Sequence, residues 1–215
     1  MSCCPPQRYD KAFGKRAARR DARRFRRRGL DGVSRRIADF LREQGVEGLS
    51  VLEIGGGVGA MQVELLRSGA ERAVNLELSP AYEETAEELL REAGLEGRVE
   101  RKLGDIAQEG DLASPADAVV MNRVVCCYPD PDALVGAAAE RTRRFLVMSF
   151  PRERRITRIG FAAANLVARV LRWDYRSWVH PHAAILAAAE RQGLRLAGES
   201  RDFVWQIAAL ERPAS

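Results

Sequence analysis

The chain has no apolar run long enough to cross a membrane, which takes about 20 consecutive apolar residues. Residues 1–6 contain no apolar stretch of the kind that a signal peptide requires. There are only four cysteines, in the adjacent pairs Cys3 with Cys4 and Cys126 with Cys127, and this spacing is not that of a disulfide framework. These absences predict a cytoplasmic protein with reduced thiols.

Lysine and histidine are also scarce. Lys11, Lys15 and Lys102 are the only lysines, so arginine supplies nearly all the positive charge of a chain with a formal net charge of +5. His180 and His182 are the only histidines available as general bases near neutral pH. Metal sites more often use Cys-x-x-Cys spacing than adjacent cysteine pairs, so we expect no metal site.

What is present fits one globular domain. The 215 residues are 46% hydrophobic and 30% charged, which is ordinary for a globular protein with a good-sized core. We expect residues 1–44 to form a basic helical arm and cap. Residues 45–215 then form the main domain, with a lid-like insertion at about 151–178.

The domain is organised around a strand, a glycine turn and a helix. The apolar run from Leu49 to Ile54 predicts a buried strand. Gly55, Gly57 and Gly59 follow at alternate positions, and an amphipathic helix comes next. This order opens a nucleotide-binding βαβ unit, in which glycines let the chain turn sharply and let a ligand contact the backbone.

Glu53, near the end of that strand, separates two kinds of ligand. A dinucleotide would place its pyrophosphate at the helix N-terminus, where a nearby carboxylate opposes it. S-adenosylmethionine (SAM) carries a sulfonium and an ammonium and has no phosphate, so it suits the same carboxylate. The pattern Glu-x-Gly-x-Gly-x-Gly at residues 53–59 therefore resembles the first motif of the class I SAM-dependent methyltransferases. SAM is the cofactor that this resemblance implies.

The second strand, at about 73–78, supplies another carboxylate. Glu77 follows the glycine loop by about twenty residues, near the spacing at which an acidic side chain binds the ribose hydroxyls of a nucleotide. Two acceptor oxygens allow it to bind both hydroxyls. We predict that Glu77 and its neighbour Leu78 contact the cofactor.

Two later strands end in further candidate cofactor residues. The third strand, near 98–103, is followed by Asp105, which can accept from an adenine amino group, and by Ile106, which can pack on the ring. Asp105 is equally able to act as a plain helix cap. The fourth strand, 118–121, is continuously apolar, as a central parallel strand should be, and Asn122 ends it.

The segment after the fourth strand is expected to face both cofactor and substrate, because ligands of open parallel sheets bind beyond the carboxyl ends of the strands. Methyl transfer needs the acceptor and the methyl group held in line, and it needs a base only if the acceptor is protonated. The candidate catalytic residues are Tyr9, Tyr128 and His180, with His182 beside them. Each of these residues could instead have a structural role. Tyr128 could be a packing ring, and His180 with His182 could mark the start of a helix.

Two basic segments lie outside the expected sheet. Residues 1–30 carry eight arginines on one predicted helix with a thin apolar stripe. We favour a solvated helix laid over the domain, which buries little, over an anion-binding, membrane-surface or RNA-binding arm. The insertion 151–173 is basic and amphipathic, which predicts either a lid helix or a helix packed on the sheet.

The chain closes with two predicted strands, 194–200 and 203–210, that form a terminal hairpin. With this hairpin, residues from about 45 to 211 resemble the class I methyltransferase fold. That resemblance implies an α/β, Rossmann-like, seven-stranded sheet with helices on both faces and the last strand antiparallel, preceded here by the N-terminal helical arm.

A narrower resemblance concerns the ends of the substrate region. Tyr9 and Phe13 in the arm, the Tyr128–Pro129 step and the basic insertion after Pro151 are similar to magnesium-protoporphyrin O-methyltransferase and its bacterial relatives. In that family an arm tyrosine and a histidine before the Tyr-Pro step are implicated in catalysis. The resemblance carries the tyrosine to Tyr9, whereas the histidine position here is Cys127.

The leading hypothesis is a SAM-dependent methyltransferase whose acceptor is an oxygen of a small hydrophobic or planar acid or phenol, which arginine can bind through paired hydrogen bonds. One alternative is an RNA or protein methyltransferase that holds its substrate with the arginine-rich arm. Asn122 and Arg123 do not form the Asn-Pro-Pro-Tyr motif of many nucleic-acid amino methyltransferases, which disfavours the RNA reading. The other alternative is a non-catalytic SAM-binding protein. The oligomeric state stays open.

Overall fold

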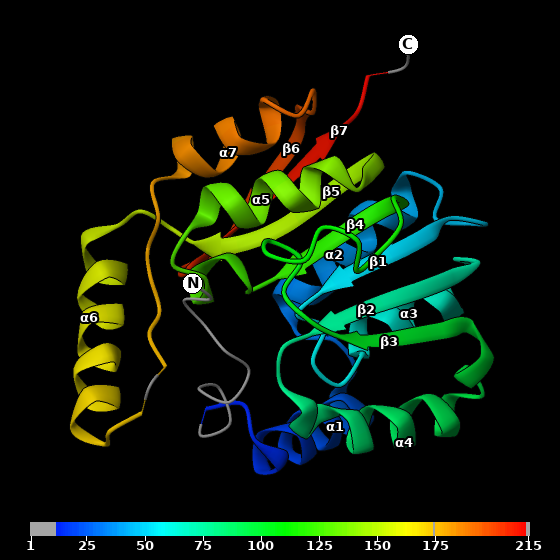
Figure 1. Cartoon of the computed structure of the whole chain (residues 1–215), viewed down its shortest axis with the longest axis horizontal. Helices are drawn as coiled ribbons and strands as arrows, with labels where there is room; N and C mark the ends of the chain where they lie inside the picture. Colours follow the sequence, from blue (N-terminus) through cyan, green and yellow to red (C-terminus); the bar gives the residue numbers. More distant parts are fainter. Residues whose placement is uncertain (1–11, 174, 214–215) are drawn as a thin grey trace.

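A computed structural model describes residues 12–173 and 175–213. Its sheet has the strand order β3-β2-β1-β4-β5-β7-β6 (Figure 1). The strands are β1 Ser50–Ile54, β2 Arg72–Glu77, β3 Val99–Leu103, β4 Ala116–Asn122, β5 Thr142–Pro151, β6 Arg195–Arg201 and β7 Trp205–Glu211. β7 runs antiparallel to both β5 and β6, whereas β1 to β5 pair in parallel. The predicted Rossmann-like seven-stranded fold is confirmed.

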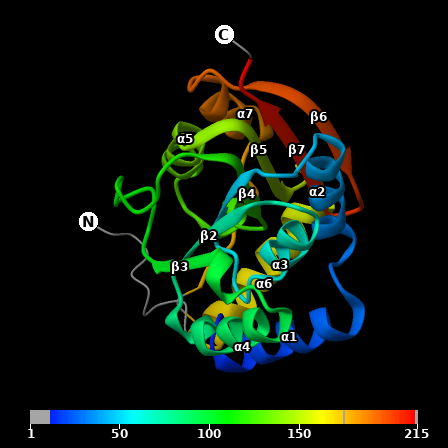
Figure 2. The same cartoon turned by 90° about the vertical axis from the view of Figure 1, so that its right-hand side faces the viewer.

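Helices cover both faces of this sheet, as expected. The helices are α1 Lys15–Arg28, α2 Gly32–Glu43, α3 Ala60–Arg67, α4 Glu83–Ala93, α5 Pro131–Glu140, α6 Arg155–Val170 and α7 His182–Glu190. Figure 2 shows α2 and α3 on one side of the sheet and α5 on the other. Because side chains alternate along a strand, Val51 joins the core under α1 to α4, and Leu52 joins the core under α5 and α7.

Side-chain caps set the starts of α2 and α5. The Asp31 carboxylate accepts hydrogen bonds from Val33 N and Ser34 N at the start of α2. Asp130 does the same for α5, with Pro131 as the first helical residue. Ser79 caps the 3-10 turn Pro80–Tyr82, and α4 follows it from Glu83.

The basic arm forms α1 and lies beside α4 (Figures 1 and 2). Its alanines Ala18 and Ala22 are fully buried, and Phe25 is nearly so. Lys15 pairs with Glu84, and Arg26 pairs with Glu92, the next-to-last residue of α4. The helix is laid over the domain as predicted, but the expectation that it buries little is wrong. Its small side chains allow a close approach to α4 and so become part of the core.

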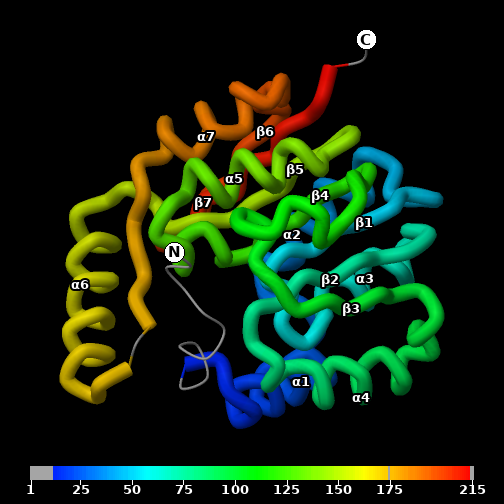
Figure 3. Tube along the Cα trace, viewed as in Figure 1, coloured from blue at the N-terminus to red at the C-terminus, as the bar shows by residue number. Residues whose placement is uncertain are grey.

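The insertion forms α6, which stands apart from the sheet (Figure 3). The interpretation in which α6 packs on a face of the sheet is wrong, because most of its large apolar side chains are exposed. Its attachment runs through Phe161, whose ring meets Trp205 edge-on, and through Asn165, which bonds the backbone of Ser177. None of the helices in the described part of the chain is long and apolar enough to cross a membrane.

Candidate functional site

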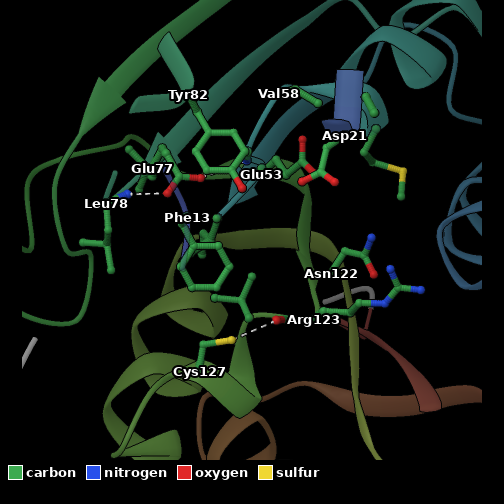
Figure 4. A pocket seen from close by; sticks show the side chains of 18 of the residues that line it. Phe13, Asp21, Glu53, Val58, Glu77, Leu78, Tyr82, Asn122, Arg123 and Cys127 are labelled. Atoms are coloured by element: carbon green, nitrogen blue, oxygen red, sulfur yellow. Dashed lines mark hydrogen bonds between the residues drawn. The ribbon is translucent and has the colours of Figure 1, made fainter. Parts of the chain in front are cut away.

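A pocket of about 310 Å³ opens at the carboxyl ends of β1, β2 and β4 (Figure 4). Two groups of residues line it. The first comes from the strand ends and the loops that follow them, which we call the sheet side: Glu53, Gly55, Gly56, Gly57, Glu77, Leu78, Asp105, Ile106 and Asn122. The second, which we call the arm side, comes from α1, the start of α2 and the segment after β4: Phe13, Arg24, Phe25, Asp31, Arg123 and Cys127.

The glycine loop has a conformation that only glycine adopts without strain. Gly55, Gly57 and Gly59 have positive φ angles of 67°, 56° and 78°. A Cβ on Gly55 would lie 2.7 Å from Val124 Cγ2, and one on Gly56 would lie 2.7 Å from Glu53 Oε2. Gly56, which the alternating pattern did not single out, is therefore equally constrained, and the loop leaves its backbone open to the pocket.

Glu77 lies beside this loop. Its Oε2 accepts from Gly57 N at 2.9 Å, and its Oε1 accepts from Leu78 N at 2.8 Å and from Ser79 N at 3.1 Å. These bonds fix the orientation of the carboxylate at the end of β2. Glu77 and Leu78 thus face the pocket together with the glycine loop.

Glu53 is the most deeply buried acid of the pocket, at 3% exposure. Burial raises its pKa to about 8, and the nearby charge of Glu77 adds to the rise, while Gln62 and Arg101 oppose it. Glu53 Oε2 has no hydrogen-bond partner within the described residues. A buried carboxylate oxygen without a partner next to an open glycine loop fits a cationic group of a ligand, and it disfavours a phosphate.

Three polar side chains under the loop were not predicted. Arg101 on β3 donates to Gly57 O at 2.9 Å and pairs with Glu83 at 2.8 Å. Gln62 and Asn75 are fully buried, and their side-chain amides lack hydrogen-bond partners in the part of the chain that the structure describes. The signal available in the sequence was a polar residue at positions that the apolar periodicity of α3 and β2 assigns to the core.

Asp105 caps a turn, since no helix lies between β3 and β4, and it also lines the pocket. Its Oδ1 accepts from Ala107 N at 3.0 Å, and its Oδ2 accepts from Tyr128 OH at 3.0 Å and from Gln108 Nε2. Ile106 lines the pocket next to it. The structure therefore brings Tyr128 to the pocket, but it places the Tyr128 hydroxyl on the sheet side, against Asp105.

Asn122 is held by a network that joins three elements. Its Nδ2 donates to Ser34 Oγ on α2 at 2.9 Å, and its Oδ1 accepts from Ser149 Oγ on β5 at 2.8 Å. Ser149 Oγ in turn accepts from Arg123 N at 2.9 Å. Arg123 has a φ of 62°, so these bonds support a backbone conformation that is costly for a residue with a side chain.

The arm side carries two arginines that share one carboxylate. Arg123 and Arg24 both pair with Asp31 Oδ2, at 2.8 Å and 2.9 Å. Burial alone would raise the pKa of Asp31, but hydrogen bonds from Ser34 N and from the Arg123 guanidinium lower it to about 2. Arg123 also lies over the ring of Trp205. Arg24, Arg123 and Asp31 together carry one net positive charge. Asp21 on α1 also lines the pocket, and it pairs with Arg20.

Cys127 lies on the arm side, where its thiol donates a hydrogen bond to Arg123 O at 3.4 Å (Figure 4). Its Sγ is 3.2 Å from Tyr175 OH and 3.7 Å from Cys126 Sγ. Hydrogen bonds from Cys126 and then from Tyr175 lower the pKa of the Cys127 thiol, and the pKa of Cys126 rises in consequence. Phe13 packs edge-on against Tyr175 and closes this wall.

Neither candidate histidine is brought to the pocket. His180 is buried with Nε2 2.9 Å from Tyr128 O, and burial lowers its pKa. His182 begins α7, and its Nε2 lies 3.0 Å from Glu153 N. Tyr9, and with it Cys3 and Cys4, lies outside the described residues. Within the described ranges no group of histidine, cysteine and acidic side chains could hold a metal ion.

Several solved structures have the same fold as this chain. Magnesium protoporphyrin IX methyltransferase from Synechocystis with bound SAH has a TM-score of 0.67 and 18% identity, covering 96% of this chain and 93% of that one. An O-methyltransferase family protein from Burkholderia thailandensis has a TM-score of 0.70 and 19% identity, covering 94% and 63%. An O-methyltransferase family 2 protein from Planctomyces limnophilus in complex with apigenin has a TM-score of 0.67 and 18% identity, covering 93% and 62%.

A search of curated proteins found no match. A comparison with protein families matches residues 22–196 to the methyltransferase domain family. This match spans the glycine loop, the Glu77 carboxylate and the segment after β4, which together form the pocket. The chain therefore belongs to the methyltransferase domain family, and it is a SAM-dependent methyltransferase.

Proposed function

We propose that this enzyme transfers the methyl group of SAM to an oxygen of a small hydrophobic or planar acid or phenol. The observation that supports this most is the composition of the arm side. Phe13 and Phe25 line the same pocket as Arg24 and Arg123, and Asp31 neutralises only half the charge of these two arginines. An aromatic carboxylate or phenolate would match both the walls and the charge.

On the sheet side we assign SAM to the residues with matching chemistry. Glu77 would accept from the ribose hydroxyls, and Asp105 would accept from the adenine amino group while Leu78 and Ile106 pack on the ring. The backbone of Gly55, Gly57 and Gly59 would lie along the ligand, with Glu53 and Asn122 toward its amino-acid end. When bound, SAM supplies an electrophilic methyl group on a sulfonium.

The protein's own contribution to the transfer is positioning and removal of a proton. Arg24 and Arg123 would orient the acceptor by its charge. Cys127 lines the arm side beside the expected acceptor position, and we propose its sulfur as the group that would take up a phenolic proton, whereas a carboxylate acceptor needs no base. Tyr9 remains a proposed positioning residue. The hydrogen bond between His180 and Tyr128 O favours a positioning role for His180.

A methyl-transfer screen with isotope-labelled SAM tests this proposal. We expect methyl ethers or esters from planar phenols and carboxylic acids, identified by mass spectrometry, and no product from amines. Arg123→Gln should raise KM for anionic acceptors more than for their uncharged analogues. Arg19→Gln is the matched control, since Arg19 is exposed on α1 and does not line the pocket. Label found only in RNA, protein or amines would contradict the proposal.

A further inference from the structure

One face of α6 is apolar over its whole length and turned toward solvent. Six large side chains at spacings of three, four and seven residues define what we call the α6 stripe: Ile156, Ile159, Leu166, Val167, Val170 and Leu171. Each of them is more than half exposed, up to 69% for Ile159 and 73% for Val170. Core-facing helices carry the same spacing on a buried face, so an exposed stripe of this kind marks an interaction surface.

The opposite face of α6 holds the helix against the rest of the molecule. Thr157 and Ala168 are its buried residues. Asn165, on the same face, bonds both N and O of Ser177, at 2.9 Å and 2.7 Å. Figures 1 and 3 show α6 standing at the edge of the molecule, away from α5 and α7. The outward direction of the α6 stripe is therefore set by contacts on its other face.

The charge around the α6 stripe has one sign. Residues 151–173 contain six arginines, Arg152, Arg154, Arg155, Arg158, Arg169 and Arg172, and one acidic residue, Glu153. Their difference is +5, which equals the formal net charge of the whole chain. Glu153 is already paired with Arg158 at 2.8 Å. The helix thus combines an apolar face with arginine flanks, the pattern of helices that lie in the surface plane of a bilayer.

We propose that α6 docks on the surface of an anionic lipid bilayer. The α6 stripe would enter the boundary between headgroups and acyl chains, and the flanking arginines would bind lipid phosphates. A second copy of this chain is a poorer occupant, because it would bring a +5 segment against an identical +5 segment in a low-dielectric contact.

Docking there would hold the pocket near the lipid. Tyr175 follows α6 closely in the chain and contacts both Phe13 and Cys127, which line the arm side. The membrane surface and the acceptor wall are therefore joined by a few residues. This proposal goes beyond the proposed function and does not depend on it, since lipid binding is measured without turnover.

Co-sedimentation of the full chain with vesicles tests the proposal. We expect binding to vesicles of phosphatidylcholine mixed with phosphatidylglycerol, and weak binding to phosphatidylcholine alone. The double variant Ile159→Asp with Val170→Asp should lower vesicle affinity about ten-fold or more, since two apolar anchors are lost and two negative charges are added. Leu196→Asp, at an exposed apolar position on β6, is the matched control and should bind like the wild type.

A second control removes charge from the other arginine-rich helix. Arg19, Arg23 and Arg27 are exposed on α1, and their triple replacement by glutamine should leave most vesicle binding intact. Trp173, exposed at the end of α6, should shift its fluorescence to shorter wavelength on mixed vesicles, and Trp173→Phe should remove that shift. Circular dichroism and SAH binding establish that each variant is folded.

Three results would overturn the proposal. The first is a wild-type chain that does not bind mixed vesicles. The second is a double variant at Ile159 and Val170 that binds as well as the wild type, or a triple α1 variant that alone loses binding. The third is a concentration-dependent dimer, seen by sedimentation, that the double variant abolishes without any vesicle binding, which would assign the α6 stripe to a second copy.

Discussion

The two sides of the pocket are built in different ways. The sheet side is made from strand ends and from the loops directly after them, so its groups meet wherever β1, β2 and β4 lie in register. The arm side joins Arg24 on α1, Asp31 before α2 and Arg123 after β4, and Tyr175 after α6 contacts its Cys127 from behind. These four parts of the chain are related only by packing.

Under the proposed function, this difference would separate cofactor binding from acceptor selection. The parallel βαβ arrangement places strand ends at one edge of the sheet in every protein that has this fold. The residues outside the sheet can change without disturbing that edge, and they line the wall that would face the acceptor. If the division holds, changes on one side should leave binding at the other side intact.

The largest effect is expected where the arm side depends on core packing. Ala22→Asp on α1 would bury an unpaired carboxylate and should lower the free energy of unfolding by about 3–5 kcal/mol, measured by urea denaturation. Ala163→Asp on α6 is the matched control, since Ala163 is exposed and only helix propensity changes, at a cost of about 0.7 kcal/mol or less. Equal losses in the two variants would mean that α1 is not part of the core.

Glu77→Gln should weaken SAM binding on the sheet side and leave the arm side of the pocket unchanged. The substitution weakens the bonds to Gly57 N and Leu78 N and the expected bonds to the ribose, and it should cost about 1–3 kcal/mol of SAM binding, measured by calorimetry. Glu71→Gln, at an exposed position before β2, should leave SAM affinity unchanged. Unchanged affinity in Glu77→Gln would remove Glu77 from the cofactor site.

The pH dependence of Glu53 gives a third test of the sheet side. Its pKa of about 8 lies above the ordinary 4.5, so the folded protein retains a proton that the unfolded chain has lost. The free energy of unfolding without ligand should therefore fall as the pH rises from 4.5 to about 8 and then level off. SAM affinity should rise over the same range, because the ionised carboxylate suits a cationic ligand. Glu53→Gln should flatten both profiles.

The smallest effects are expected from two substitutions, one at Tyr128 on the sheet side and one at Cys127 on the arm side of the pocket. Tyr128→Phe removes the bond to Asp105 and should weaken SAM binding by about 0.5–1.5 kcal/mol, because the hydroxyl lies on the sheet side. Cys127→Ala should leave SAM affinity unchanged and slow transfer to phenolic acceptors. If the Cys127 variant lost SAM affinity and the Tyr128 variant did not, the assignment of these residues to the two sides would be reversed.

Part of the site could be predicted because it is local. Glu53, the glycines and Glu77 are placed by a strand, a turn and a helix that follow one another in the chain. The spacing of the apolar residues in the strand and the helix indicates the type of each element. Asn75 and Gln62 were not predicted, because a polar residue at a core position only interrupts the apolar periodicity and does not indicate a site. Their position under the loop emerges only when β2 and α3 are packed together.

The direction in which a side chain points was the second feature of the site that could not be predicted from the sequence. Residue type made His180 a candidate base, but the direction of its ring depends on the carbonyl of Tyr128, which lies fifty-two residues earlier. The same holds for the Tyr128 hydroxyl, which Asp105 draws to the sheet side. A hydrogen bond between distant residues is not visible in either local pattern.

The sequence by itself determined the seven-stranded fold, the cofactor motif and the presence of two arginine-rich amphipathic helices. Only the tertiary structure decided which of the two helices buries its apolar stripe. The short alanine stripe of α1 is buried, because α4 lies close enough to offer both an apolar surface and acidic partners such as Glu84 and Glu92. The broader stripe of α6 stays exposed, because its opposite face makes the contacts that fix the helix. Periodicity states which residues share a face, but burial requires a second surface, and packing alone determines where that surface is.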